Sequence, residues 1–390
     1  MITSKKNYVS DMVQQLKPSG IRKFFDLAAG MEGVVSLGVG EPDFVTPWHV
    51  REEAIRSLET GFTAYTPNAG LLELRQEIAH YMSSRFNVTY DPEHEVIVTV
   101  GASSAIDIAM RTILNPGEEV IVVEPCFVSY VPTVELAGGK AVTVQALQEN
   151  DFKILPSQLE AVVTDRTKAI MLCSPNNPTG TMLNKEELEA IAQFAIKHDI
   201  LVIADEIYAE LSYDEDYTSM GAIENMRERT ILINGFSKGF AMTGWRLGFV
   251  CAPRDISEAM LKIFQYQLMC ASTMSQYAAI EALRNGRPEV DMMVKSYRRR
   301  RNFIVESFNE MGLSCHNPGG AFYAFPSIKS TGLTSQQFAE QLLQQEKVAV
   351  VPGDVFGESG EGHIRCSYAS SLEQLQEAVT RIKRFIESLK

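Results

Sequence analysis

Short apolar runs rich in β-branched residues alternate with amphipathic stretches through the middle of the chain. The runs are, in order, residues 96–100, 119–123, 141–144, 169–173 and 201–204. Stretches with helical periodicity include residues 101–114, 127–136 and 185–198, the last with Asn184 and Glu187 in capping-box positions. Strands that are apolar throughout and separated by helices are typical of a parallel sheet buried on both faces. The pattern therefore predicts an α/β fold in which helices sandwich a mostly parallel sheet.

Toward the N-terminus this alternation gives way to turns and two helices. Residues 1–20 form a polar arm that ends at Lys17-Pro18-Ser19-Gly20, residues 34–39 predict a short strand, and residues 40–44 predict a turn. A helix begins near Pro47, and its predicted apolar face consists of Val50, Ala54, Ile55 and Leu58. After a loop at residues 65–70, the next helix is predicted to bury Leu71, Leu74, Ile78 and Met82.

Toward the C-terminus long helical patterns dominate. Residues 255–284 and 289–311 each predict one helix, and the second is long enough to bridge two domains. Helices at residues 335–346 and from Leu372 onward accompany strands near residues 348–351 and 363–367. We therefore expect an arm at residues 1–18, a smaller α+β domain from residues 19–47 and 286–390, and a large α/β domain at residues 48–285.

Composition narrows the class of protein. The chain has 390 residues, of which 45% are apolar and 22% charged, as in globular proteins with more than one core. The formal net charge of −13 argues against nucleic acid and against an anionic membrane surface as partners. Apolar stretches stay well short of the roughly 20 residues that a membrane helix needs. The N-terminus also lacks the apolar segment of a signal peptide, so we expect a cytoplasmic location.

The cysteines and histidines suggest neither disulfides nor a metal. The six cysteines have no paired spacing, and most lie in apolar runs, which is typical of reduced thiols in a core. The six histidines form no i, i+4 pair and no cluster with cysteine. We expect no metal site built from protein ligands.

The most distinctive chemistry lies at residues 231–249. An apolar run ends at Gly235, and Lys238 follows between a hydroxyl residue, Ser237, and a glycine. Apolar neighbours disfavour the ammonium form of a lysine and lower its pKa, and a neutral amine can condense with a carbonyl. Ser237 and Arg246, eight residues beyond the lysine, are residue types that bind phosphate. A strand-turn-strand with a surface lysine is the alternative, unless other stretches bring partners to the same site.

Other polar residues follow predicted strands of the sheet. Asp205 comes directly after the run at residues 201–204, and Tyr208 lies three residues further on. Asn177 lies in the stiff, proline-containing loop at residues 174–180, after another strand. Ligands of open α/β sheets bind at the carboxyl ends of the strands, so these side chains are candidates for one site. Taken alone, each is equally compatible with a cap or a turn.

A further candidate is the strand-to-helix turn Gly101-Ala102-Ser103. Its free backbone amides and the dipole of the following helix suit a phosphate group. The turn lacks the G-x-G-x-x-G pattern of nicotinamide enzymes, which disfavours an oxidoreductase.

Together these stretches resemble the class I/II aminotransferases of the aspartate aminotransferase type, which are fold type I pyridoxal-phosphate enzymes. The resemblance extends from about residue 18 to the C-terminus. It rests on motifs that occur in family order and spacing: residues 175–180 (PNNPTG), 205–208 (DEIY), Ser237-Lys238, residues 244–248 (GWRLG) and Arg365 within residues 363–367. Within the family the chain is most similar to bacterial enzymes that act on alanine, aspartate or aromatic amino acids, with 2-oxoglutarate as acceptor.

The resemblance implies a role for each candidate residue. Lys238 would bind pyridoxal 5'-phosphate as an internal aldimine and then act as the general acid/base, and Asp205 would keep the pyridine nitrogen protonated. Asn177 and Tyr208 would donate hydrogen bonds to the phenolic oxygen and lower the aldimine pKa, and Phe127 would stack on the ring. The phosphate would be bound by Gly101, Ala102, Ser103, Ser237 and Arg246.

The resemblance also implies a substrate clamp and a partner. Arg365 would hold the α-carboxylate bidentately, and Gly40 and Asn177 would line that end of the site. Tyr65 would reach the phosphate of the neighbouring subunit, so the active form would be a homodimer with shared sites.

The chain departs from the family pattern at two positions, and one side-chain partner is unassigned. Gly235 stands where many relatives carry a phosphate-binding serine, and Phe127 stands where tryptophan or tyrosine is common. Arg22 is a candidate partner for a side-chain carboxylate by position only, and it is equally compatible with a surface residue.

Two other functions are compatible with parts of the pattern. A pyridoxal-phosphate-dependent C–S β-lyase of the same fold would use the same lysine and differ in losing a β-substituent. A non-catalytic regulator with an aminotransferase-like domain would add a DNA-binding segment, for which residues 1–20 are too short and insufficiently basic.

Overall fold

The computed structural model describes residues 8–16, 18, 20–21 and 30–389. Its apolar runs form a seven-stranded sheet in the order β2-β8-β7-β6-β5-β3-β4. The strands are β2 (Val96–Thr99), β3 (Glu119–Glu124), β4 (Lys140–Gln145), β5 (Thr167–Cys173), β6 (Leu201–Asp205), β7 (Thr230–Gly235) and β8 (Gly248–Cys251). β8 is antiparallel to both of its neighbours, β2 and β7, and the other pairs in this sheet are parallel. The predicted α/β class and mostly parallel sheet are confirmed.

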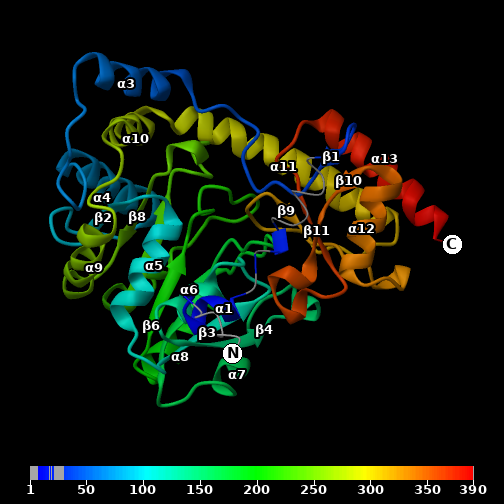
Figure 1. Ribbon diagram of the computed structural model, residues 1–390, viewed down its shortest axis with the longest axis horizontal. Coiled ribbons are helices and arrows are strands. Elements are labelled where there is room, and N and C mark those ends of the chain that lie inside the picture. Colours follow the sequence, from blue (N-terminus) through cyan, green and yellow to red (C-terminus); the bar gives the residue numbers. More distant parts are fainter. Residues whose placement is uncertain (1–7, 17, 19, 22–29, 390) are drawn as a thin grey trace, which may run out of the picture.

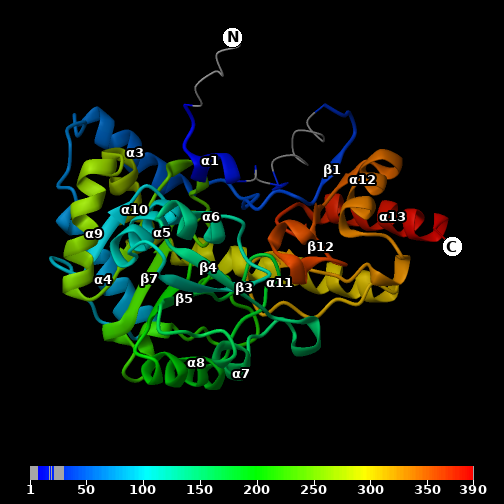
Figure 2. The same cartoon turned by 60° about the horizontal axis from the view of Figure 1, so that its bottom comes forward.

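Helices cover both faces of this sheet. Every strand except the edge strand β4 is therefore almost wholly buried. One face packs against α5 (Ala102–Ile113), α6 (Tyr130–Leu136) and α9 (Arg254–Gln267). The other packs against α7 (Pro156–Glu160) and α8 (Lys185–Lys197), and near β2 and β8 against α4 (Leu72–Phe86) and α10 (Thr273–Asn285). In Figure 2, α7 and α8 lie below the sheet, and α5 and α6 lie above it. Because β3, β5, β6 and β7 are parallel, the residues at their carboxyl ends lie along the same edge of the sheet.

A smaller region combines the two ends of the chain. Its helices are α11 (Arg287–Glu310), α12 (Ser335–Glu346) and α13 (Leu372–Ser388). Its strands are β9 (Tyr323–Ala324) and β12 (Ile364–Ser367), with β11 (Val351–Pro352), in an antiparallel sheet, and β1 (Val35–Ser36) beside β10 (Val348–Ala349). The long helix α11 runs from α10 into this region (Figure 1). The residue boundaries given above for the domains stay a prediction.

Two sequence-based expectations for the helices are wrong. Residues 255–284 form two helices, because the chain turns at Met269, whose φ is 62°, and α10 restarts after Ser272. The helix predicted at residue 127 begins at Tyr130 instead.

The face of the helix after Pro47 is also only partly as predicted. In α3 (Trp48–Glu59), Val50 and Ala54 are buried against α10, but Ile55 and Leu58 are 45% and 51% exposed. Apolar residues therefore extend onto an uncovered side of this helix.

Other local features agree with the sequence. The capping box at Asn184 and Glu187 forms, and α12 spans the residues predicted for it. The predicted N-terminal arm contains the short helix α1 (Asp11–Gln15), which the sequence pattern did not indicate. All six cysteines are free thiols, and five of them are buried. Among the described helices, none has the length and apolar character needed to cross a bilayer.

Candidate active site

A cavity of about 370 Å³ opens at the carboxyl ends of β5, β6 and β7, between the large sheet and the smaller region. Eleven of the thirteen residues predicted for the site line it: Gly40, Ala102, Ser103, Phe127, Asn177, Asp205, Tyr208, Ser237, Lys238, Arg246 and Arg365. The remaining two are Gly101, which borders Arg246, and Tyr65, which lies elsewhere. Residues separated by more than 300 positions along the chain thus share one site.

Lys238 lies in the loop after β7, and its amine faces the cavity. Its Nζ donates a hydrogen bond to the carbonyl oxygen of Gly40 at 2.7 Å. Burial, reinforced by the charge of Arg365, lowers the pKa of Lys238 to about 8, against an opposing effect of Glu41. A tenfold larger fraction of neutral amine results for each unit by which the pKa falls. The lysine is therefore suited to attack a carbonyl carbon.

Asp205 is the last residue of β6 and lies 4% exposed at the floor of the cavity. Its Oδ2 accepts a hydrogen bond from the hydroxyl of Tyr130 at 2.7 Å, and its Oδ1 accepts one from the backbone N–H of Ile207 at 3.2 Å. Burial raises the pKa of Asp205, although both hydrogen bonds favour the carboxylate. A cationic ring nitrogen placed at this floor would pair with the carboxylate in a medium of low dielectric constant.

Arg365 is buried on β12 and lines the cavity from the smaller region. Its Nη1 donates to Oδ1 of Asn177 at 2.9 Å, and its Nη2 donates to the carbonyl oxygen of Gly38 at 2.7 Å. The guanidinium lies over the ring of Tyr323 at 4.5 Å. Its buried Nε has no hydrogen-bond partner within the described residues. A buried guanidinium held in one plane suits a carboxylate ligand.

Arg246 and the start of α5 form the third wall. Gly101 precedes α5 with φ of 77°, and a Cβ atom on it would lie 2.7 Å from Nη2 of Arg246. A side chain at residue 101 would displace this guanidinium and would also be strained at that φ, so the glycine favours its approach to the helix N-terminus. Ser103 and Ser237 line the same side of the cavity. Cation, hydroxyls and helix N-terminus together fit a phosphate group.

The glycine at position 235 has a structural cause. A Cβ atom there would lie 2.8 Å from Cα of Gly248 and 3.1 Å from the carbonyl oxygen of Leu247. Gly235 pairs with Gly248 where β7 and β8 approach the start of α5. A serine at this position would collide with backbone, which accounts for the glycine in this chain.

Tyr65 does not reach the cavity of its own chain. It is 79% exposed, on the loop between α3 and α4. The loop is nevertheless well held, since Thr273 donates to the carbonyl oxygen of Ala64 at 2.8 Å and Gln276 donates to Thr66 Oγ1 at 3.1 Å. Arg22, the candidate for a side-chain carboxylate, lies outside the described residues.

Sequence reasoning missed several residues that line the cavity. Tyr130 lies three residues after Phe127, and in the helix predicted over residues 127–136 that spacing would have pointed to the same wall, although α6 begins only at Tyr130. Tyr323 sits in an apolar stretch and carries no comparable signal. Glu41 and Thr243, which are hydrogen-bonded to each other, also line the cavity. No group of three or more potential metal ligands occurs among the residues with described positions.

Comparisons with known proteins agree with this geometry. A sequence profile of aminotransferase class I and II matches residues 32–382. The Bacillus subtilis protein YugH is 66% identical over 97% of this chain and 98% of its own length. An aspartate aminotransferase of Pyrococcus abyssi is 49% identical over 98% of this chain and 99% of its own length. The crystal structure of an aromatic aminotransferase of Pyrococcus horikoshii superimposes with a TM-score of 0.90, at 46% identity, covering 94% of this chain and 99% of that one.

Aminotransferases of the aspartate aminotransferase type use pyridoxal phosphate, and the cavity fits that group. It is lined by a lysine of lowered pKa, a buried carboxylate, and an arginine beside a helix N-terminus that suits an anion. The chain therefore belongs to the class I and II aminotransferases and is an enzyme that transfers amino groups with pyridoxal 5'-phosphate as its cofactor.

Proposed function

We propose that the enzyme transfers an amino group between an L-amino acid and a 2-oxo acid in a ping-pong cycle, with Lys238 as the residue that binds the cofactor. The observation that supports this most is the convergence of Lys238, Asp205 and Arg365 on one cavity. Bound pyridoxal phosphate supplies an aldehyde for the substrate's amino group and a ring that accepts electron density from Cα. The protein's own residues account for the remaining requirements.

Lys238 acts as the acid/base group in this proposal. Once the substrate's amine has displaced it, its Nζ is a free amine with a lowered pKa beside the carbonyl of Gly40. Such a group would take the proton from the substrate's Cα and return it two bonds away, to the carbon that carried the cofactor's aldehyde. Asp205 holds a proton on the ring nitrogen through its buried carboxylate, and Tyr130 orients that carboxylate.

The substrate is bound at its carboxylate end by Arg365, next to Gly40. Asn177 accepts from Nη1 of Arg365, which directs the amide nitrogen of Asn177 away from the guanidinium. That nitrogen and the hydroxyl of Tyr208 are the proposed donors to the phenolic oxygen of the cofactor. Phe127, an apolar residue of the wall, is the proposed stacking partner of the ring.

The phosphate end is proposed to need a second copy of the chain. Gly101, Ala102, Ser103, Ser237 and Arg246 supply one side of it. Arg246 is itself exposed, so this end of the cavity is open. The exposed Tyr65 lies near Phe62 and Leu58, which are also half exposed, as expected of a surface that a partner covers. We propose a homodimer in which Tyr65 of one subunit binds the phosphate held by the other.

The amino donor is proposed to be alanine, aspartate or an aromatic amino acid, with 2-oxoglutarate as acceptor. The names of the relatives, which include aspartate and aromatic-amino-acid aminotransferases, support this range. Arg365 recognises the carboxylate that all of these substrates share, so it gives no preference among them.

A single-turnover experiment on the holoenzyme tests the proposal. Mixing it with each donor in the absence of acceptor should give pyridoxamine phosphate and one equivalent of the corresponding 2-oxo acid per site. Lys238→Ala should abolish steady-state turnover, whereas Lys185→Ala, at a 68% exposed lysine, should leave it unchanged. Release of ammonia and a β-substituent from a cysteine conjugate, without formation of pyridoxamine phosphate, would indicate a β-lyase instead.

A further inference from the structure

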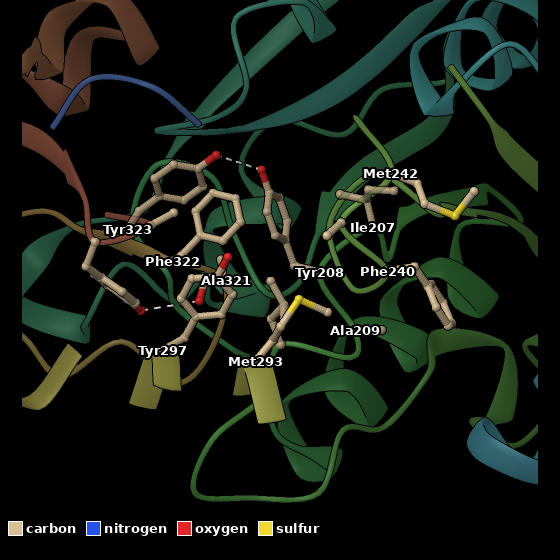
Figure 3. Packing of buried hydrophobic residues seen from close by; sticks show 14 of the residues in the cluster. Ile207, Tyr208, Ala209, Phe240, Met242, Met293, Tyr297, Ala321, Phe322 and Tyr323 are labelled. Atoms are coloured by element: carbon tan, nitrogen blue, oxygen red, sulfur yellow. Dashed lines mark hydrogen bonds between the residues drawn. The ribbon is translucent and has the colours of Figure 1, made fainter. Parts of the chain in front are cut away.

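Tyr323 connects the two regions of the molecule that enclose the cavity. It lies on β9 of the smaller region, where it pairs with Ser367, two residues after Arg365 on β12. Its side chain is buried and lines the cavity. The hydroxyl oxygens of Tyr323 and Tyr208 lie 2.8 Å apart, and Figure 3 shows the two side chains pointing toward each other. Tyr323 therefore links a strand of the smaller region to the loop after β6 in the large region.

The hydroxyls of Tyr323 and Tyr208 have one favourable orientation when the cavity holds a hydrogen-bond acceptor for Tyr208. Each hydroxyl carries a single proton, and burial raises the pKa of both tyrosines, so both protons stay in place at neutral pH. If Tyr323 donates to Tyr208, the proton of Tyr208 is left for an acceptor in the cavity. A hydroxyl that accepts one hydrogen bond also becomes a stronger donor in the next.

The ring of Tyr323 has a separate neighbour. The guanidinium carbon of Arg365 lies 4.5 Å from its centroid, within the range of a cation–π interaction. On the other side, a Cβ atom on Gly40 would lie 2.4 Å from the hydroxyl oxygen of Tyr323. The ring is thus confined between the residues that are proposed to bind the substrate's carboxylate.

We propose that Tyr323 is a positioning residue with two separable parts. Its hydroxyl directs the proton of Tyr208 toward the phenolic oxygen of the cofactor, and its ring holds the guanidinium of Arg365 in the plane that receives the substrate's carboxylate. This proposal rests on the roles proposed above for Tyr208 and Arg365.

The electrostatic surroundings are the same in all the variants that test it. The basic residues that face this part of the cavity are Lys238, Arg246 and Arg365. The acidic residues are Asp205 and Glu41. The uncharged titratable groups nearby are Tyr130 and Cys173. Substitutions at Tyr323 leave every one of these in place, so a shift in the titration of the bound cofactor reports the lost hydroxyl.

Tyr323→Phe tests the hydroxyl. The pKa of the cofactor bound to Lys238 is read from the pH dependence of its visible absorbance in the holoenzyme. Losing one hydrogen bond of ordinary strength should raise that pKa by about half a unit to one unit, because Tyr208 becomes a weaker donor to the phenolic oxygen. The dissociation constant of 3-phenylpropionate, a carboxylate without an amino group, should change less than about twofold, since the ring remains.

Tyr323→Leu tests the ring. It should raise the cofactor pKa by the same amount and also weaken binding of 3-phenylpropionate by roughly three- to tenfold, the range of a partly buried cation–π contact. If this variant proves unstable by thermal melting, Tyr323→Phe still decides the hydroxyl's role, and Tyr323→Met, which adds no titratable group, replaces Tyr323→Leu for the second measurement.

Two controls separate this proposal from the roles on which it rests. Tyr297→Phe removes a hydroxyl from the same cluster, where Tyr297 packs on Phe322 at 5.5 Å but does not line the cavity, and it should change neither quantity. Tyr208→Phe should raise the cofactor pKa at least as much as Tyr323→Phe. A rise in Tyr208→Phe without any rise in Tyr323→Phe would overturn the role of Tyr323 alone. An unchanged pKa in Tyr208→Phe would overturn both that role and the function proposed for Tyr208.

Discussion

Asp205 and Lys238 lie largely buried at the carboxyl ends of two strands, whereas Tyr65 has 79% of its side chain exposed on a surface loop. Each of the first two contacts residues of its own chain: Asp205 accepts from Tyr130, and Lys238 donates to Gly40. Tyr65 has no such neighbour in the cavity. Asp205 and Lys238 thus have partners within the single chain, whereas Tyr65 is open to the partner subunit proposed above.

The exposure of Tyr65 does not arise from a poorly held loop. The loop that carries Tyr65 is fixed by hydrogen bonds from Asn68, Thr273 and Gln276, and Gln276 is fully buried. Exposure of an aromatic side chain on a well-fixed loop is typical of a residue that is presented to a partner. Burial alone therefore does not identify the residues of the site: Asp205 and Lys238 have contacts within one chain, whereas Tyr65 is held in place and exposed, as the proposed homodimer requires.

The largest effect on the buried side is expected from Asp205→Asn. The shape of the side chain is kept, but the ring nitrogen loses the carboxylate that holds its proton, so kcat should fall on the order of a thousandfold. Cofactor affinity should fall much less. Asp199→Asn, at a 91% exposed aspartate, is the control and should be silent. A kcat within a few-fold of wild type in Asp205→Asn would contradict the assigned role.

A smaller loss is expected from Arg365→Lys. A point charge cannot reproduce the planar pair of donors, and the loss of one charged hydrogen bond should raise KM by roughly ten- to a hundredfold. The increase should be similar for every amino acid and 2-oxo acid, measured in parallel with Arg298→Lys at a half-exposed arginine. An increase confined to one class of substrate would place Arg365 at the side chain of the substrate instead of its carboxylate.

The smallest effect on activity is expected from a substitution at Glu206. This prediction tests whether a carboxyl that is buried outside the cavity contributes to activity. Glu206 accepts from Ser219 and from the N–H of Met220, both at 2.9 Å, and burial raises its pKa from 4.5 to about 7. Between these two values the folded state keeps a proton that the unfolded state has lost, so this group's contribution to stability falls as pH rises through that range.

Glu206→Gln should therefore gain stability relative to wild type, by roughly 1–3 kcal/mol, as pH is raised from about 5 to about 7. Denaturant unfolding at several pH values measures this, and kcat should stay near that of wild type. A stability difference that does not depend on pH would contradict the raised pKa.

The sequence was sufficient to predict site residues that lie at or shortly after the end of a strand. Lys238, Asp205 and Asn177 follow apolar runs, and the parallel sheet then brings them together without further information. The capping box at Asn184 was predictable for a similar reason, because its partners lie three residues apart.

The sequence was insufficient where a position depends on distant partners. The break between α9 and α10 at Met269 is stabilised by the loop of Tyr65, since the carbonyl oxygen of Met269 accepts from Asn68, about 200 positions away. Tyr323 gave no signal because its function depends on Tyr208 and Arg365, which meet it only in the folded chain. Ile55 and Leu58 fit a buried helical face by spacing, yet the described residues leave them 45% and 51% exposed.

The measurement that tests the account most directly combines its two halves in one dimer. Lys238→Ala removes the amine from the buried part, and Tyr65→Asp sets a carboxylate against the phosphate from the exposed part, so each homodimer should be nearly inactive. In a mixed dimer one site carries both changes and the other carries neither. Unfolding and refolding equal amounts together makes half of the dimers mixed, so about a quarter of wild-type activity should return. If verified mixed dimers stay as inactive as their parents, the shared site is wrong.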